Sequence, residues 1–161
     1  MSGGAKAVLA GGFACGVLDI TQAFVGWGLE GVAPIRILQS VASGLLGRAS
    51  FQGGWSSAAL GLLCHFVIAF GAAAVYYLAS RRIGFMTEHS VLAGLLYGEI
   101  VFWFMQYVVV ELSRARRRSI ADWDWATIIT GPIGHMFLVG LPIALAVARF
   151  APLSSRTPGR P

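Results

Sequence analysis

The stretch from Trp55 to Ser80 reads WSSAALGLLCHFVIAFGAAAVYYLAS, and it decides the class of fold. It contains no Lys, Arg, Asp or Glu, and a single imidazole, that of His65, lies near its middle. A helix of about 20 apolar residues crosses the hydrocarbon core of a bilayer. We therefore expect a transmembrane helix here, approximately over residues 55–80.

Three further stretches, at about 7–29, 90–112 and 125–148, are also long and apolar enough to cross a membrane. The chain of 161 residues is 57% hydrophobic and only 12% charged, which is typical of integral membrane proteins. The sequence therefore predicts an all-α bundle of four transmembrane helices as a single domain over residues 1–150. A tail rich in Pro, Ser and Arg follows at 151–161.

The connection between the first two spans contains a helical pattern at about 34–50. Its apolar positions are Ile35, Leu38, Val41, Ala42, Leu45, Leu46 and Ala49, and its polar positions are Arg36, Gln39, Ser40, Ser43 and Arg48. This pattern is typical of an amphipathic helix lying along the membrane interface. A docking surface for a partner and a re-entrant lid are the alternatives.

The net charge of +5 does not indicate a nucleic-acid partner, because the basic residues lie at helix ends and in the tail. Phospholipid head groups are the expected partners there, and the candidates are Arg36, Arg48, Arg114, Arg116, Arg117 and Arg118. Lys and Arg divide equally between the two sides, so they do not fix the orientation. If Arg36 and Arg48 lie in the interface, the balance favours cytoplasmic termini.

Each span carries one ionisable residue near its middle: Asp19, His65, Glu99 and His135 in chain order. Such a residue facing lipid costs at least about 2.5 kcal/mol, so it usually turns inward and finds partners. Gln22, one turn after Asp19, and Gln106, two turns after Glu99, add amides to the same faces. These six residues are the candidate midplane cluster.

The order acid, histidine, acid, histidine suggests that a two-helix unit is repeated in tandem. Each histidine lies four residues after a glycine, in GLLCH ending at His65 and in GPIGH ending at His135, although similar composition alone would also produce this likeness. A tandem repeat would relate the halves by a pseudo-two-fold axis along the membrane normal, so that all four residues could meet. The GxxxG pairs Gly12–Gly16 and Gly94–Gly98 predict close helix packing beside the acids.

Three hypotheses account for the cluster. It could hold the helices together through acid–histidine hydrogen bonds, or form a proton or ion path. It could also bind a metal ion or haem, with His65 and His135 as candidate ligands. Pro142 should remove a backbone hydrogen bond and kink the last span just beyond His135.

The chain resembles the small uncharacterised four-helix inner-membrane proteins of bacteria, of the YagU-like kind. The resemblance rests on the Gly-rich first span, the amphipathic connection, and the segment from Ser43 (SGLLGRASFQGGW) through His65. It implies a bacterial cytoplasmic membrane and no particular activity. The sequence has no nucleophile elbow, phosphate loop, HExxH or CxxC motif, so it does not indicate an enzyme.

We therefore predict an accessory or structural subunit that packs against itself, as a homo-oligomer, or against a larger membrane complex. A small transporter or a proton or ion conduit using the midplane residues is the alternative. A haem- or metal-binding membrane protein is the third hypothesis, although no resident cofactor is the simplest expectation.

Overall fold

The computed structural model describes residues 1–116 and 123–152, and every regular element in those ranges is helical. In chain order the elements are α1 (Gly3–Leu29), α2 (Pro34–Leu46), a 3-10 segment (Gly47–Gln52), α3 (Gly54–Ser80), α4 (Phe85–Glu88), α5 (Ser90–Phe104), a π-helical segment (Met105–Val109), α6 (Val110–Leu112), α7 (Trp125–Ile128), two π-helical segments (Ile129–Ile133 and Met136–Gly140) and α8 (Leu141–Phe150). We refer to residues 125–150 together as the fourth helix.

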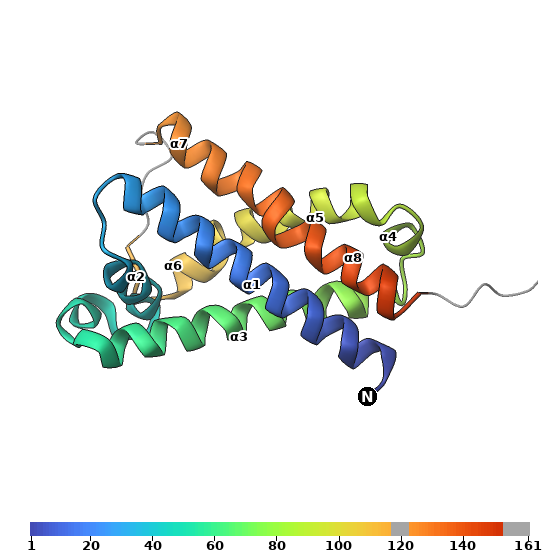
Figure 1. Ribbon diagram of the computed structural model, residues 1–161, viewed down its shortest axis with the longest axis horizontal. Coiled ribbons are helices and arrows are strands. Elements are labelled where there is room, and N and C mark those ends of the chain that lie inside the picture. Colours follow the sequence, from blue (N-terminus) through green and yellow to red (C-terminus); the bar gives the residue numbers. More distant parts are fainter. Residues whose placement is uncertain (117–122, 153–161) are drawn as a thin grey trace, which may run out of the picture.

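Four of these helical stretches are long and apolar enough to cross a membrane: Gly3–Leu29, Gly54–Ser80, Ser90–Leu112 and Ile129–Phe150. The predicted all-α bundle with four membrane-spanning helices is confirmed. Helix α1 packs between α3 and the fourth helix, and α5 packs on the fourth helix as well. The N-terminus, α4 and the end of α8 lie at one end of the bundle, and α2 and α7 lie at the other (Figure 1). We call these the terminal end and the distal end.

Glycines set close helix contacts in the terminal half of the bundle. A Cβ on Gly11 would come within 3.1 Å of the Ile143 backbone, and one on Gly94 within 3.0 Å of the Gly140 carbonyl oxygen. Small residues let helix backbones approach in this way, which is how helices associate in lipid. The core that they enclose is made of fully buried small and aliphatic side chains together with one aromatic ring: Ala7, Ala73, Tyr76, Ile143, Ala144 and Val147.

Two tyrosines and an arginine close the terminal end further. The Tyr97 hydroxyl donates to the Ala72 carbonyl oxygen at 2.7 Å, which joins α5 to α3, and the Tyr76 hydroxyl donates to Met86 at 2.8 Å. Arg81 donates to the Ala151 carbonyl oxygen just after α8. These three bonds pair polar side chains at the terminal end and join α3 to α4, to α5 and to the residue after α8.

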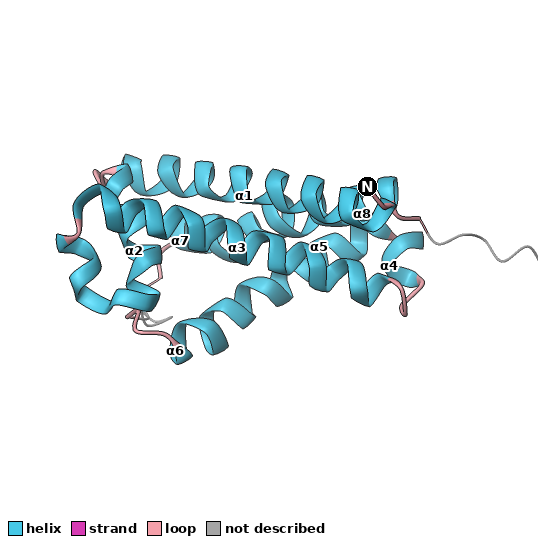
Figure 2. Cartoon of the chain, turned by 90° about the horizontal axis from the view of Figure 1, so that it is seen from below, coloured by secondary structure: helices cyan, strands magenta, loops and turns pink. Residues whose placement is uncertain are grey.

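The distal half of the bundle is spread apart by bulky side chains. Gly98 lies directly on the backbone of His135 and Met136, but one turn later the buried ring of Phe102 stands between α5 and the fourth helix. A Cβ on Gly131 would lie 3.0 Å from that ring. Beyond Phe102 the helix widens into the π-helical segment Met105–Val109, and α6 diverges from the bundle (Figure 2).

Helix α2 forms as predicted, and its buried face combines residues of both predicted faces. Gln39 and Ser43 are buried together with Ile37 and Ala42. The exposed residues likewise include both kinds: Arg36, Ser40, Leu45, Leu46 and Arg48. The backbone of α2 crosses α3 at Gly61, where no side chain could fit. Close approach of this kind favours small side chains on the packed side, and Ala42 and Ser43 are both buried there.

The contacts of the two helix pairs are unequal. Helix α1 has extensive contacts with both α3 and the fourth helix, whereas α5 has extensive contacts only with the fourth helix among these spans. The tandem repeat therefore stays a prediction.

Pro142 lies in the first turn of α8, directly after a π-helical turn at Met136–Gly140. A π-helical turn lets the helix continue where a proline disrupts the regular ladder.

Candidate functional site

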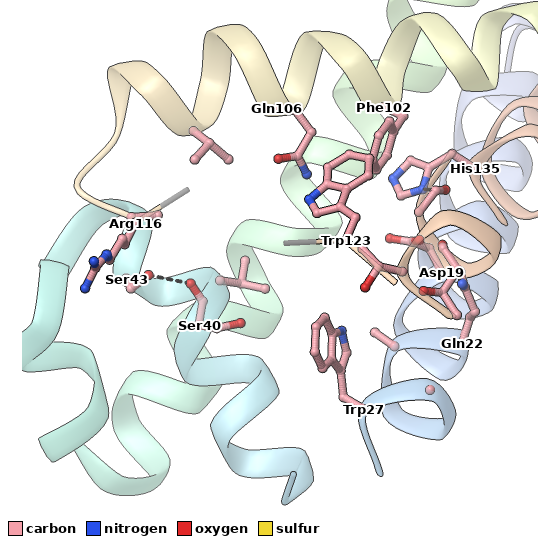
Figure 3. Close-up of a pocket in the computed structure, with 18 of the residues that line it drawn as sticks. Asp19, Gln22, Trp27, Ser40, Ser43, Phe102, Gln106, Arg116, Trp123 and His135 are labelled. Carbon is pink, nitrogen blue, oxygen red and sulfur yellow. Dashed lines mark hydrogen bonds between the residues drawn. The ribbon is translucent and has the colours of Figure 1, made fainter. Parts of the chain in front are cut away.

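A cavity of about 530 Å³ lies in the distal half, where the helices diverge. Its walls come from the second half of α1, the side of α2 that bears Ser40 and Ser43, the end of α5 with α6, and the start of the fourth helix. Figure 3 shows Trp27 and Trp123 on opposite sides of this space, with Asp19, Gln22 and His135 at one end. Arg116 lies at the other end, beside α2.

A second cavity of about 200 Å³ adjoins the inner end of the first. The two share Asp19, Val41 and His135, and the smaller one adds His65 and Cys15. Asp19 lies ten residues before the end of α1, about 15 Å at the helical rise, which is half the thickness of the hydrocarbon core. The cavities therefore lead from the distal end to the middle of the bundle.

The two histidines are held by backbone carbonyls through different ring nitrogens. His65 Nε2 lies 2.8 Å from the carbonyl oxygen of Gly16 on α1, and His135 Nδ1 lies 2.9 Å from that of Gly131 in its own helix. A carbonyl oxygen only accepts, so each of these nitrogens carries the proton of the bond. The other nitrogen, Nδ1 of His65 and Nε2 of His135, is left to accept a proton or bind a ligand.

Asp19 completes the inner end of the cavities. In the described part of the chain its carboxylate accepts no hydrogen bond and forms no ion pair. One hypothesis for the cluster was that acid–histidine hydrogen bonds hold the helices together. Among the described residues, Asp19 forms no such bond. A half-buried carboxylate of this kind, at membrane depth, is costly unless water or a ligand reaches it.

The two glutamines of the predicted cluster also line the larger cavity. The Gln22 side chain donates to the Thr130 carbonyl oxygen at 2.5 Å and so joins α1 to the fourth helix. That carbonyl lies in the π-helical segment Ile129–Ile133, which contains Pro132. Gln22 packs over Gly134, where a Cβ would lie 2.7 Å from its amide nitrogen.

Glu99 does not join the other five residues. It lines neither cavity, and its carboxylate accepts a hydrogen bond of 2.9 Å from Trp103 Nε1, one turn further along the same span. The reason is the neighbouring glycine, which presses on the fourth helix. Adjacent residues on a helix point about 100° apart, so an inward Gly98 turns Glu99 aside.

The predicted packing glycines have different neighbours. Gly12 and Gly16 lie against the rings of Phe70 and Phe66 on α3, whereas Gly94 and Gly98 lie against the backbone of the fourth helix. Helices α1 and α5 are therefore each held close to another helix, not to one another.

The predicted head-group arginines that the structure describes are exposed: Arg36, Arg48, Arg114 and Arg116. Arg36 donates to the Phe51 carbonyl oxygen at 2.9 Å, and the Arg114 backbone amide donates to Gly44 at 2.9 Å, which fixes the loop after α6 to α2. Arg117 and Arg118 lie outside the described residues. So does the tail beyond Pro152.

The metal hypothesis lacks a ligand cluster among the described residues, where no group of three or more His, Cys, Asp and Glu side chains is placed to hold an ion. His65 and His135 both reach the smaller cavity, yet each already uses one nitrogen on a carbonyl. A carbonyl bond at one nitrogen is compatible with a ligand at the other, so both stay candidates for binding a proton or a cation.

Sequence reasoning missed the aromatic walls of the larger cavity. Phe102 is 4% exposed and packs edge-on against His135, with ring centroids 5.0 Å apart, and against Trp123 at 5.7 Å. Trp103 in turn stacks on Trp123 at 5.9 Å. The signal available in the sequence was the aromatic density of residues 102–107 and 123–125.

Comparison with protein-family models, with curated proteins and with solved structures found no match. The four apolar helices define the class to which the chain belongs, a polytopic membrane protein. Its particular role has to be argued from the cavity.

Proposed function

We propose that this membrane protein is a small carrier that takes up a solute into the cavity from the distal face. Its ionisable residues at mid-depth bind and release protons as the solute moves. The observation that supports the proposal is the convergence of Asp19, His65 and His135 on two adjoining cavities. Each has a polar atom without a partner in the described part of the chain. Ionisable residues at membrane depth that face a cavity are typical of proton and substrate pathways.

The shape of the bundle favours a carrier over an open conduit. The cavity is accessible from the distal half, whereas small residues and the Tyr97–Ala72 hydrogen bond pack the terminal half. A site open to one face and closed to the other corresponds to one state of an alternating-access cycle. The π-helical segments on both sides of His135 are the natural places for the fourth helix to change shape.

The test is solute-dependent proton movement in liposomes that contain the purified protein and a trapped pH-sensitive dye. Organic ammonium, amino-acid and carboxylate solutes are added in turn, and protein-free liposomes set the background. We expect one class to change the internal pH, and Asp19→Asn to reduce that rate at least about tenfold, since its amide cannot take up the proton. Glu99→Gln is the matched control, because Glu99 lines neither cavity.

Two results would refute the carrier. One is the absence of any solute-dependent pH change above the background. The other is a folded Asp19→Asn protein that moves protons as fast as the wild type.

A second proposal, an accessory subunit, is favoured by Glu99. This half-buried carboxylate lies outside the cavities, and Trp103, which bonds it, is 36% exposed, so a neighbouring membrane protein has a polar contact available. Native mass spectrometry after mild extraction from the membrane tests it. Co-release with other subunits supports the proposal, and a bare monomer or dimer that moves solute in liposomes refutes it.

For location we propose a bacterial cytoplasmic membrane with cytoplasmic termini. The resemblance to bacterial inner-membrane proteins supports the first part. The packing of α2 supports the second: Arg36 is engaged with the Phe51 carbonyl and ring, so it belongs to the interface helix and not to a free loop. The cavity then faces the outside.

A further inference from the structure

We infer that the larger cavity binds an organic ammonium group, held by the Asp19 carboxylate between the rings of Trp27, Trp123 and Phe102. The inference deepens the proposed function by naming the chemical class of its solute, and it rests on that function only in using the same cavity. It stands on charge, shape and the kind of surface that lines the space.

The charge of the lining favours a cation. Among the described residues, the charged side chains that line the cavity are Asp19, Glu30 and Arg116, which give a formal charge of −1 with neutral histidine. The arginine lies beside α2, away from Asp19 (Figure 3). Asp19, at the inner end, therefore forms no ion pair with a Lys or Arg among the described residues.

The aromatic rings favour an organic cation over a metal ion. The face of a tryptophan attracts an ammonium group within about 6 Å, and rings around such a group are the usual recognition of quaternary ammonium ions. Trp27 and Trp123 stand on opposite sides of the space in front of Asp19 (Figure 3). A metal ion would instead need several oxygen, nitrogen or sulfur ligands, and the described residues do not gather three of them.

Two of the three rings, Phe102 and Trp123, are held in place before any ligand arrives. Phe102 is 4% exposed between α5 and the fourth helix, and it fixes Trp123, which is also stacked on Trp103. A volume of about 530 Å³ accommodates a small organic molecule, and pockets of this size usually combine apolar walls with a few polar groups. Preorganised walls of this kind reduce the entropy lost on binding.

The test compares choline with dimethylbutanol, its neutral isostere, in which a carbon atom replaces the ammonium nitrogen. Binding is measured by titration calorimetry on the full chain in nanodiscs of phosphatidylglycerol. We expect choline to bind at least about tenfold more tightly than the isostere, with roughly tenfold loss in Asp19→Asn. Trp27→Ala should lose about three- to thirtyfold and Trp27→Phe should recover most of it, because cation–π attraction contributes on that scale.

Equal affinity for choline and its isostere overturns the inference, as does undetectable choline binding by folded protein or an unaltered affinity in Asp19→Asn. A lipid head group and a free solute both carry ammonium chemistry, so a second set of discs contains phosphatidylethanolamine. A lower choline affinity in those discs identifies the head group as the source, and an unchanged affinity identifies a free solute. Both results support the ammonium site.

Transport is measured separately, so the two ideas fail in different ways. Proton flux that depends on Asp19 but follows amino-acid or carboxylate solutes, with no choline binding, refutes the ammonium class and leaves the carrier. Tight choline binding without any flux refutes the carrier and leaves the binding site.

Discussion

Single glycines decide where the backbones of this bundle touch and where they separate. Gly98 contacts the backbone of His135 and Met136, so a side chain there would have to push the fourth helix away. Gly71, in α3, has nothing within 4 Å of the position a Cβ would occupy. The two positions therefore separate the packing role of glycine from its intrinsic effect on a helix.

We predict that Gly98→Ala destabilises the protein by about 1–3 kcal/mol, the usual cost of overpacking against atoms that cannot yield. Gly71→Ala should be neutral or stabilise by up to about 1 kcal/mol, because alanine loses less backbone freedom in a helix. Thermal unfolding in detergent measures both. Equal effects of the two substitutions would contradict the close contact at Gly98.

Asp19 and His65 make opposite contributions to stability. We predict that Asp19→Asn maintains or raises the free energy of unfolding, by up to about 2 kcal/mol, because it removes a charge that lacks a partner in the described part of the chain. His65→Phe should lower it by about 0.5–1.5 kcal/mol, since the bond to the Gly16 carbonyl is lost. Chemical or thermal unfolding in one detergent compares them.

A purely structural cluster predicts losses in both variants, so a marked loss in Asp19→Asn would favour that hypothesis. Five of the six residues of the predicted cluster line the cavities: Asp19, Gln22, His65, Gln106 and His135. Glu99 does not, and the sequence could not show this, because hydropathy shows the depth of a residue but not its direction. Only the contact at Gly98 fixes that direction.

Among the elements, α2 shows best how a bilayer changes the meaning of an amphipathic pattern. The pattern correctly predicted a helix at this position, because periodicity depends on the chain alone. The choice of inward face depends on whether water or lipid covers the other side, and the sequence does not state this. Gln39 is 3% exposed and donates to the Gly54 carbonyl oxygen at 3.0 Å, so this member of the polar set is packed inward, whereas Arg36 and Ser40 stay exposed.

We predict that Gln39→Met, which preserves volume, destabilises the protein by about 1–3 kcal/mol, because a buried carbonyl loses its donor. Ser40→Ala is the control, since the Ser40 hydroxyl bonds only within its own helix, to the Ile37 carbonyl at 2.7 Å, and its side chain is exposed. Thermal unfolding in nanodiscs provides the measurement. If Gln39→Met left the stability unchanged, Gln39 would not be packed inward, and the polar face of α2 would instead lie in water.

For the whole molecule, the contrast between the two ends is the feature with most consequence. Glycine and alanine hold the terminal half together, whereas Phe102 and the tryptophans spread the distal half, so one chain builds both a closed and an open end. The composition of the helices does not by itself predict this difference between the two ends, because one must first know which helices are neighbours. Four spans of similar hydropathy allow several arrangements, and short loops do not choose among them.

Thiol labelling of two positions on α1 tests this arrangement. Ala23 lines the cavity and Val25 is 59% exposed on the outer surface, which is lipid-facing in a membrane; both lie at nearly the same depth. In a protein whose Cys15 and Cys64 are replaced by alanine, we predict that a charged, membrane-impermeant maleimide labels Ala23→Cys at least about tenfold faster than Val25→Cys. The reaction needs a thiolate, which forms in a water-filled cavity and not in hydrocarbon.

The side from which the reagent acts reports the orientation in the same experiment. With cytoplasmic termini the cavity faces outward. The reagent should then label Ala23→Cys in cells whose outer membrane is permeabilised and whose cytoplasmic membrane is intact, and it should not label it in sealed inverted vesicles. The opposite pattern reverses the orientation and leaves the cavity in place, since Ala23→Cys still reacts. Labelling of Val25→Cys as fast as Ala23→Cys would instead mean that no water-filled space reaches this depth, and both the carrier and the ammonium site would then lose their structural basis.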